Sequence, residues 1–278
     1  MPSLNDQHQR ATCKNCVLRE TCFPPGLSRG DLEHAEHLVS TRLRIRRGGA
    51  LYRRGDAFNS FYVVWLGSLK STVASNDARE QVTGFHLTGD MVGFDGLDGG
   101  SHACDTVALE DSEVCVFPYH RIDEVTAALP ALRGHFHRLM SREIVRKHEL
   151  ILMLGSMGAH ERLASFLVDL SDRFESRGYS SREFVLRMTR AEIGSFLGIT
   201  LETVSRVMSQ FARDGLIGLR GVKEVAIIDP VRLRRLAVGR ETGGSDRQPA
   251  RGPGARAGAE ARRPTTRTVR EAVVEVFA

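Results

Sequence analysis

The chain has 278 residues, of which 41% are hydrophobic and 26% are charged, and its formal net charge is +5. These values are typical of a globular protein of about two domains, and they exclude a chain that is disordered throughout. No run approaches the roughly 20 apolar residues that span a bilayer, and the first residues lack the apolar core of a signal peptide. We therefore expect a cytoplasmic protein that makes no membrane contact.

The positive charge of the chain is local. Residues 1–179 have a net charge of −2, whereas residues 180–223 hold seven Lys or Arg against four Asp or Glu. A basic segment near the C-terminus is typical of a small DNA-binding module, and it argues against a surface that binds polyanions throughout.

The N-terminal segment is rich in cysteine, since three of the five cysteines fall within ten residues: Cys13, Cys16 and Cys22. Because the cytoplasm is reducing, we interpret the cysteines as ligands and not as disulfide partners. Prolines and a glycine follow at 24–26 and no apolar period is sustained. Residues 1–30 are therefore predicted to form an irregular arm that a metal centre would order.

Short β-rich runs recur between about residues 42 and 118, for example at 61–66 and 114–117, and glycines separate them. Turn residues at such regular spacing predict a small β-barrel or jelly roll.

A long amphipathic helix is predicted from Leu129 to about Met157, because apolar residues recur there at helical spacing. Packing against the chain's own barrel explains part of this stripe, but the helix is longer than a small barrel can cover. We interpret the rest as a dimer seam. The apolar residues assigned to the seam are Phe136, Met140, Ile144, Ile151 and Leu154.

Two short helices are predicted next, in the order typical of a DNA-binding unit. Thr189 and Glu192 form a capping box that opens a helix to Leu197, and Gly198 ends it. Thr200 can cap a second helix that runs from Leu201 to about Arg213.

The second of these helices separates into an apolar and a polar face, and the polar face carries Glu202, Ser205, Arg206 and Ser209. Arg206 can donate a bidentate pair to guanine, Glu202 can accept from cytosine N4, and Ser205 can contact several bases. Residues 216–228 then predict a hairpin whose tip, with Arg220 and Lys223, is a candidate wing against phosphate. The alternative is a small helical subdomain with a solvated charged face.

With these residues in view, the sequence resembles the CRP/FNR family of bacterial transcription regulators, and its FNR subgroup in particular, over essentially residues 12–238. The stretches that carry the resemblance are Gly84–Asp95, Glu161–Ala164 and Glu202–Arg206. The resemblance implies an α+β fold: an N-terminal β-roll of the jelly-roll, cyclic-nucleotide-binding-like type, a long dimerisation helix and a C-terminal winged helix-turn-helix.

The resemblance also implies a division of the chain. We expect a cysteine-rich cluster-binding arm (residues 1–30) and a β-roll sensory domain (31–128). A dimerisation helix (129–158), a winged helix-turn-helix DNA-binding domain (159–238) and a tail without fixed structure (239–278) are expected to follow.

By the same resemblance, Cys115 matches the family's fourth ligand, and Cys13, Cys16, Cys22 and Cys115 would hold an oxygen-sensitive [4Fe-4S] cluster. Cys104 has no counterpart and is expected to be structural. Four thiolates suit Zn²⁺ equally well, so the spacing alone leaves a structural zinc site, or another effector, open. The cluster would favour a homodimer that binds a palindrome like TTGAT, four spacer bases, ATCAA, and that controls anaerobic genes with RNA polymerase as a partner.

Three further expectations complete the interpretation. Glu149 lies beside the seam, where FNR proteins carry an acidic residue, and two facing carboxylates would oppose dimerisation without the cluster; the alternative is a solvated Glu. No cyclic nucleotide is expected, because Phe94 stands at the family's ribose-binding Glu and no Arg or Lys occurs from Asp95 to His120. Nor is an enzyme expected, because we find no Ser/His/Asp constellation, phosphate loop or flavin fingerprint.

Overall fold

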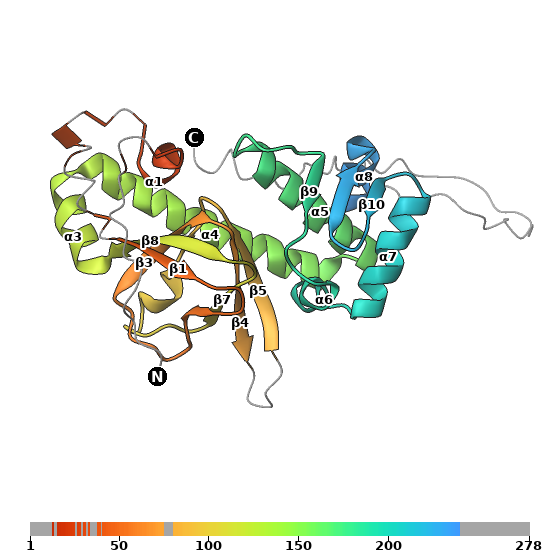
Figure 1. The fold of residues 1–278 in the computed structure, drawn as a ribbon, viewed down its shortest axis with the longest axis horizontal. Helices are drawn as coiled ribbons and strands as arrows, with labels where there is room; N and C mark the ends of the chain where they lie inside the picture. Colours follow the sequence, from red (N-terminus) through yellow and green to blue (C-terminus); the bar gives the residue numbers. More distant parts are fainter. Residues whose placement is uncertain are drawn as a thin grey trace, which may run out of the picture. The chain divides into compact units, whose positions relative to one another are not determined.

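The computed structural model describes residues 13, 16–25, 27, 28, 30, 31, 33, 38, 39, 41–74 and 80–239. The expected C-terminal tail beyond Gly239 lies outside these residues. In the described part, a β-roll is followed by a long helix and a C-terminal group of helices with a small sheet (Figure 1).

The β-roll consists of two four-stranded antiparallel sheets, with strand orders β1-β8-β3-β6 and β2-β7-β4-β5. A 3₁₀ turn, η1 (Phe94–Gly96), follows β6. The strands are β1 (Thr41–Ile45), β2 (Ala50–Tyr52), β3 (Ser60–Leu66), β4 (Ser68–Ala74), β5 (Glu80–Leu87), β6 (Met91–Val92), β7 (Asp105–Ala108) and β8 (Ser112–Pro118). The turn-separated β-runs of the sequence therefore form the predicted roll.

The two faces of the sheet that contains β8 pack against different groups of residues, because neighbouring residues of a strand point to opposite faces. Val64 and Val114 belong to a cluster with Ile45, Tyr52 and Leu69 of the roll. The residues next to them in β3 and β8 join a second cluster, which includes residues of the N-terminal arm and of the helices after β8: Cys13, Phe23, Val63, Cys115, Ile122 and Leu132.

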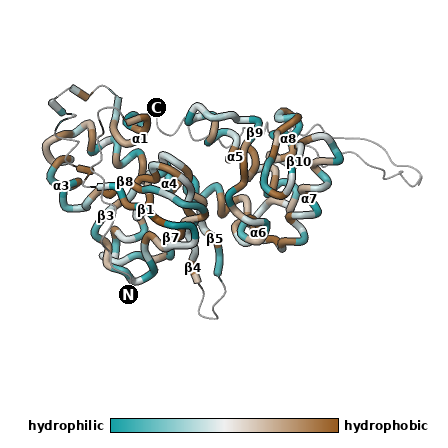
Figure 2. Tube along the Cα trace, in the orientation of Figure 1, coloured by the Kyte–Doolittle hydropathy of each residue, from teal (hydrophilic) through white to brown (hydrophobic). Residues whose placement is uncertain are grey.

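Two helices follow the roll, α3 (Tyr119–Ala128) and α4 (Pro130–Ser156). Pro130 begins α4 at a position where its missing N–H costs nothing. Along its trace α4 alternates between hydrophilic and hydrophobic segments (Figure 2), as the predicted amphipathic stripe requires. The helix α3 was not predicted, because its mixture of polar and apolar residues shows no sustained period.

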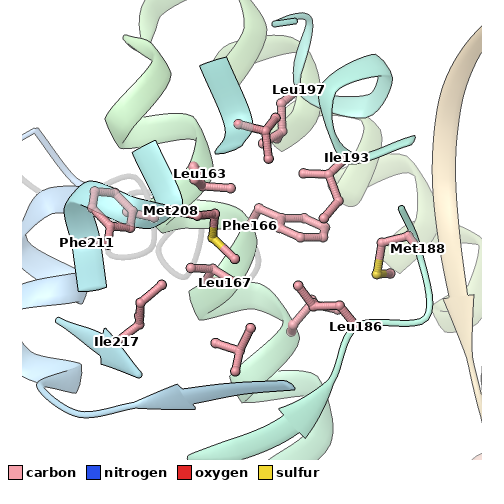
Figure 3. Close-up of a cluster of buried hydrophobic side chains, with 14 of the residues drawn as sticks. Leu163, Phe166, Leu167, Leu186, Met188, Ile193, Leu197, Met208, Phe211 and Ile217 are labelled. Atoms are coloured by element: carbon pink, nitrogen blue, oxygen red, sulfur yellow. The ribbon is translucent and has the colours of Figure 1, made fainter. Parts of the chain in front are cut away.

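The C-terminal part consists of α5 (Ala159–Glu175), β9 (Glu183–Val185), α6 (Arg190–Leu197), α7 (Leu201–Arg213), β10 (Ile217–Arg220), β11 (Glu224–Ile227) and α8 (Pro230–Ala237). Its apolar core is built on α5, with Leu163 and Leu167 fully buried between α6, α7 and the small sheet (Figure 3). The predicted hairpin is β10-β11, and β9 adds an unpredicted third strand beside β11.

Arg162, in the first turn of α5, holds the carboxyl ends of α4 and α6. It donates to the carbonyls of Leu154 and Met157 at the end of α4 and to that of Leu197 at the end of α6, at 2.8–2.9 Å. The last carbonyls of a helix have no partner within the helix and carry its negative dipole end, so a guanidinium is well suited to this position.

Candidate functional site

Cys115 lies on the side of β8 that faces the N-terminal arm. Its Cα partners are Arg42 on β1 and Val63 on β3, so the three side chains form a row across one face of the sheet. Cys115 is 6% exposed.

The described arm cysteines lie against this row. Cys13, Cys16, Cys22 and Cys115 line one pocket, and the same pocket is walled by aromatic and cationic side chains. The amide of Cys16 donates to the carbonyl of Cys13 at 3.1 Å, and Cys22 ends the single-turn helix α1 (Arg19–Cys22). The structure thus brings together the four cysteines that the sequence analysis singled out, from positions about a hundred residues apart.

Cys104 lies elsewhere, in the cluster with Tyr52 and Val64. Its Sγ donates to the Asp95 carboxylate at 3.3 Å, and burial together with that carboxylate raises the pKa of the Cys104 thiol to about 11. The Cys104 thiol is thus held by a hydrogen bond inside the roll, apart from the pocket that the other four cysteines line.

Burial also raises the pKa of Cys22, and neighbouring thiols add to the effect. For Cys115, burial raises the pKa, while a hydrogen bond from Arg42 and the charge of Arg42 act in the opposite direction. A thiol must lose its proton to bind a metal, so a cation beside the pocket favours the ligating form. Among the described residues, no group of three or more His, Cys, Asp or Glu side chains is already arranged to hold a metal ion.

The arm contacts two other elements. The carbonyl of Thr21 accepts a hydrogen bond from Nε2 of His135 on α4, at 3.1 Å. A Cβ placed on Gly89, which has a φ of +91°, would lie 3.4 Å from Cγ2 of Thr21 and 3.6 Å from Nε of Arg177. The turn after β5 is therefore held closely between the arm and the turn that follows α5.

The next residue of that turn, Asp90, is the centre of a buried ion cluster. Its carboxylate, 4% exposed, accepts from Nη2 of Arg173 at 2.5 Å and from Nη2 of Arg177 at 2.7 Å. Burial alone would raise the pKa of Asp90, but the charges of Arg173, Arg177 and Arg146 and the amide of Leu87 outweigh it and lower that pKa well below its usual range. The cluster joins the β-roll to both α4 and α5.

The predicted helix-turn-helix is confirmed in detail. Thr189 accepts from the amide of Glu192 in a capping box, α6 ends at Gly198 with a φ of +62°, and Thr200 caps α7 by accepting from the amide of Thr203 at 3.2 Å. The apolar face of α7 is buried through Val204, Val207, Met208 and Phe211.

The opposite face of α7 meets solvent. Glu202, Arg206 and Ser209 are exposed and Ser205 is half-buried. Hydrogen bonds from its own amide and from the Thr200 hydroxyl lower the pKa of Glu202, which keeps it an acceptor. The Ser209 hydroxyl donates to the carbonyl of Ser205 at 2.9 Å, so its proton is used within the helix.

Arg220 ends β10 and Lys223 lies in the turn before β11, and both are exposed. These two cations are carried on the same hairpin, as the sequence analysis expected.

The residues assigned to the dimer seam have different environments along α4. Ile144 and Ile151 are 57% and 66% exposed, and Glu149 is also exposed, whereas Met140 is half-buried. Phe136 packs edge-on against Phe61 of the roll, with ring centroids 4.9 Å apart, and Leu154 lies close to Gly198. Val145 and Leu152, which the sequence analysis did not include, extend the exposed apolar stripe.

A β-roll, a long helix and a helix-turn-helix with an exposed polar face define a DNA-binding transcription regulator. The description "Cyclic nucleotide-binding domain" matches residues 42–128, and "Crp-like helix-turn-helix domain" matches residues 161–236. No helix in the described ranges is long and apolar enough to cross a membrane.

Individual relatives and a solved structure extend the comparison beyond these two domain descriptions. The chain is 47% identical to "Transcriptional regulatory protein btr" of Bordetella pertussis over 84% of this chain and 95% of that protein. It is 39% identical to "Fumarate and nitrate reduction regulatory protein" of Escherichia coli K12 over 81% of this chain and 90% of that protein. The solved structure of FixK2 from Bradyrhizobium japonicum matches 72% of this chain and 98% of its own, with 29% identity and a TM-score of 0.67. The chain therefore belongs to the CRP/FNR family of transcription regulators, whose members bind DNA and dimerise.

Proposed function

We propose that this protein is a cytoplasmic, FNR-type regulator that senses oxygen through a [4Fe-4S] cluster held by Cys13, Cys16, Cys22 and Cys115. With the cluster in place it dimerises and binds a palindrome like TTGAT, four spacer bases, ATCAA, as an activator or a repressor of anaerobic genes. The observation that carries the proposal is the pocket on which all four cysteines converge.

The residues of the pocket fit such a group. Four sulfur donors suit a soft iron or zinc centre, and the aromatic walls exclude water. The buried Nε of Arg42 has no hydrogen-bond partner in the described structure, so a cation with an unused donor is available to an anionic centre. When bound, the cluster would supply a reaction with oxygen that destroys it and so removes the link between the arm and the roll.

The chain's own contacts provide a route from the arm to the DNA-binding part. Ordering Thr21 favours its hydrogen bond to His135 on α4 and its contact with the turn at Gly89. The next residue of that turn, Asp90, binds Arg173 on α5 and Arg177 in the turn that follows α5. A shift between mostly monomer and mostly dimer needs only a few kcal/mol of coupling, which contacts of this number can provide.

Pairing of two α4 helices would bury the exposed stripe of Ile144, Val145, Ile151 and Leu152. Glu149, exposed beside this stripe, would face its equivalent and oppose pairing when the cluster is absent.

On DNA, the exposed face of α7 would enter the major groove. Arg206 would bind the half-site guanine, Glu202 a cytosine and Ser205 a neighbouring base, while Thr200, Ser209, Arg220 and Lys223 would contact phosphates or flanking bases. RNA polymerase is the expected partner at promoters, and no cyclic nucleotide is expected, because Phe94 opens η1 where nucleotide-binding members place a Glu.

The experiment is anaerobic purification followed by a visible spectrum and by iron, sulfide and zinc analysis. We expect a coloured protein with four irons per chain, and loss of the colour in the Cys115→Ser variant but not in Cys104→Ser. A colourless preparation that contains zinc in place of iron would contradict the oxygen-sensing function and leave a regulator with a structural zinc site.

A further inference from the structure

The proposal above uses Arg42 only as a cation with an unused donor in the pocket wall, yet its position is specific. It is the Cα partner of Cys115 in the β1-β8 pairing, so the two side chains leave the sheet on the same face. Its guanidinium carbon lies 3.8 Å from the ring centroid of Trp65, which also lines the pocket.

This stacking fixes a planar cation at the wall of the pocket. The Trp65 ring covers one face of the guanidinium and directs its N–H groups sideways. The Nε of Arg42 is buried and has no acceptor among the described residues. Because a buried donor without an acceptor is unfavourable, the unoccupied donor indicates an acceptor that completes the pocket.

The chemistry of that acceptor follows from the cysteines. Any centre held by four thiolates, with iron and sulfide or with zinc, carries a net negative charge and presents sulfur as a hydrogen-bond acceptor. Arg19 also lines the pocket, but it is exposed to solvent and screened. Glu113, on the same strand as Cys115, is paired with Arg44 at 2.7 Å.

We propose that Arg42, held flat by Trp65, is the residue that compensates the charge of the cysteine-held centre and donates a hydrogen bond to one of its sulfurs. This inference rests on the proposed function. Arg42 is a positioning residue: it ligates no metal, but its charge stabilises the thiolates as ligands and determines how firmly the centre is retained.

The test compares the parent with Arg42→Gln, Arg42→Lys and the control Arg46→Gln, which removes an exposed arginine just after β1. Each protein is reconstituted with ferrous iron and sulfide under anoxia, and the rate of iron loss to a ferrous chelator is measured without oxygen. The emission of Trp65, the one tryptophan in the sequence, provides a second signal at the pocket itself. Circular dichroism of the metal-free proteins checks that the variants fold.

We expect Arg42→Gln to lose iron about tenfold faster or more, as loss of an outer-shell partner does. Arg42→Lys, which keeps the charge and loses the stacked plane, should fall between, and Arg46→Gln should match the parent. In the parent and in each variant, the emission of Trp65 should return at the same rate as iron is lost.

The outcomes separate the two proposals. If the parent takes up iron and Arg42→Gln retains it as long as the parent does, Arg42 has no such role, while the proposed function stands. If the parent takes up no iron and Trp65 emission does not respond, the proposed function is wrong and the role of Arg42 is overturned with it.

Discussion

Asp90→Asn should strongly destabilise the protein, because it removes the anion from between two buried cations. The carboxylate is 4% exposed, and the side chains of Arg173 and Arg177 are 13% and 14% exposed. Removing one partner of a buried ion pair typically costs about 3–5 kcal/mol. Arg173 and Arg177 keep hydrogen bonds to the carbonyls of Phe85 and Thr88, so we expect the lower end, about 3 kcal/mol.

For a protein of this size that loss corresponds to roughly 10 °C in Tm, measured by calorimetry on the metal-free protein. The matched control is Asp172→Asn, which breaks an equally short pair with Arg234 whose side chains are about half exposed. Such surface pairs contribute about 0–1 kcal/mol, so Tm should change by only a few degrees. Equal shifts in the two variants would refute the stabilising role of the buried cluster.

The pH dependence of this difference has a definite sign. Because the pKa of Asp90 is lowered in the folded state, its stabilisation is complete above the pKa of an unfolded Asp, about 4, and is lost as the pH falls below it. The difference in stability between the parent and Asp90→Asn should therefore be constant from pH 5 to 8 and become smaller at acidic pH.

Three further predictions concern the base contacts, a buried histidine and the dimer seam. Arg206→Ala should lose about 1–3 kcal/mol of discrimination at the half-site guanine, measured by competition between operators that differ at single bases. Lys223→Ala, the control, should weaken binding to all sites alike. Unchanged selectivity in Arg206→Ala would show that Arg206 makes no base contact. Burial, opposed in part by nearby carboxylates, lowers the pKa of His86 to about 4, so stability should fall by roughly 2 kcal/mol from pH 7 to pH 5 as the unfolded chain gains a proton. His86→Gln should lack that component in urea unfolding at the two pH values, and an identical loss in both proteins would contradict it. Glu149→Ala should strengthen dimerisation of the metal-free protein up to about fivefold in sedimentation runs, and a variant as monomeric as the parent would show that Glu149 is only solvated.

The parts of the fold that local chemistry determines were predictable from the sequence. The caps at Thr189 and Thr200 mark α6 and α7 because each cap satisfies amides within three residues of itself. Strand alternation likewise separates Cys115 from Val114, since neighbouring residues of a strand point to opposite faces.

Features that depend on distant pairing were not predictable. Strand β9 has three residues and is defined only by its pairing with β11, about forty residues later. Asp90 stands in a stretch that supported the family resemblance, but its partners are 83 and 87 residues away, on α5 and in the turn that follows it. In the sequence, Arg42 is one of two arginines in β1, and only the register with Cys115 and the stacking on Trp65 distinguish it.

The most direct measurement is operator affinity as a function of bound iron, by fluorescence anisotropy under anoxia and again after exposure to air. We expect the iron-loaded protein to bind the palindrome about 5- to 150-fold more tightly than the same sample after air, the range that a coupling of 1–3 kcal/mol produces. Cys104→Ser should behave as the parent, and Cys115→Ser should bind weakly in both conditions. Full-strength binding by iron-free protein, unchanged by air, would contradict control of DNA binding by the four cysteines.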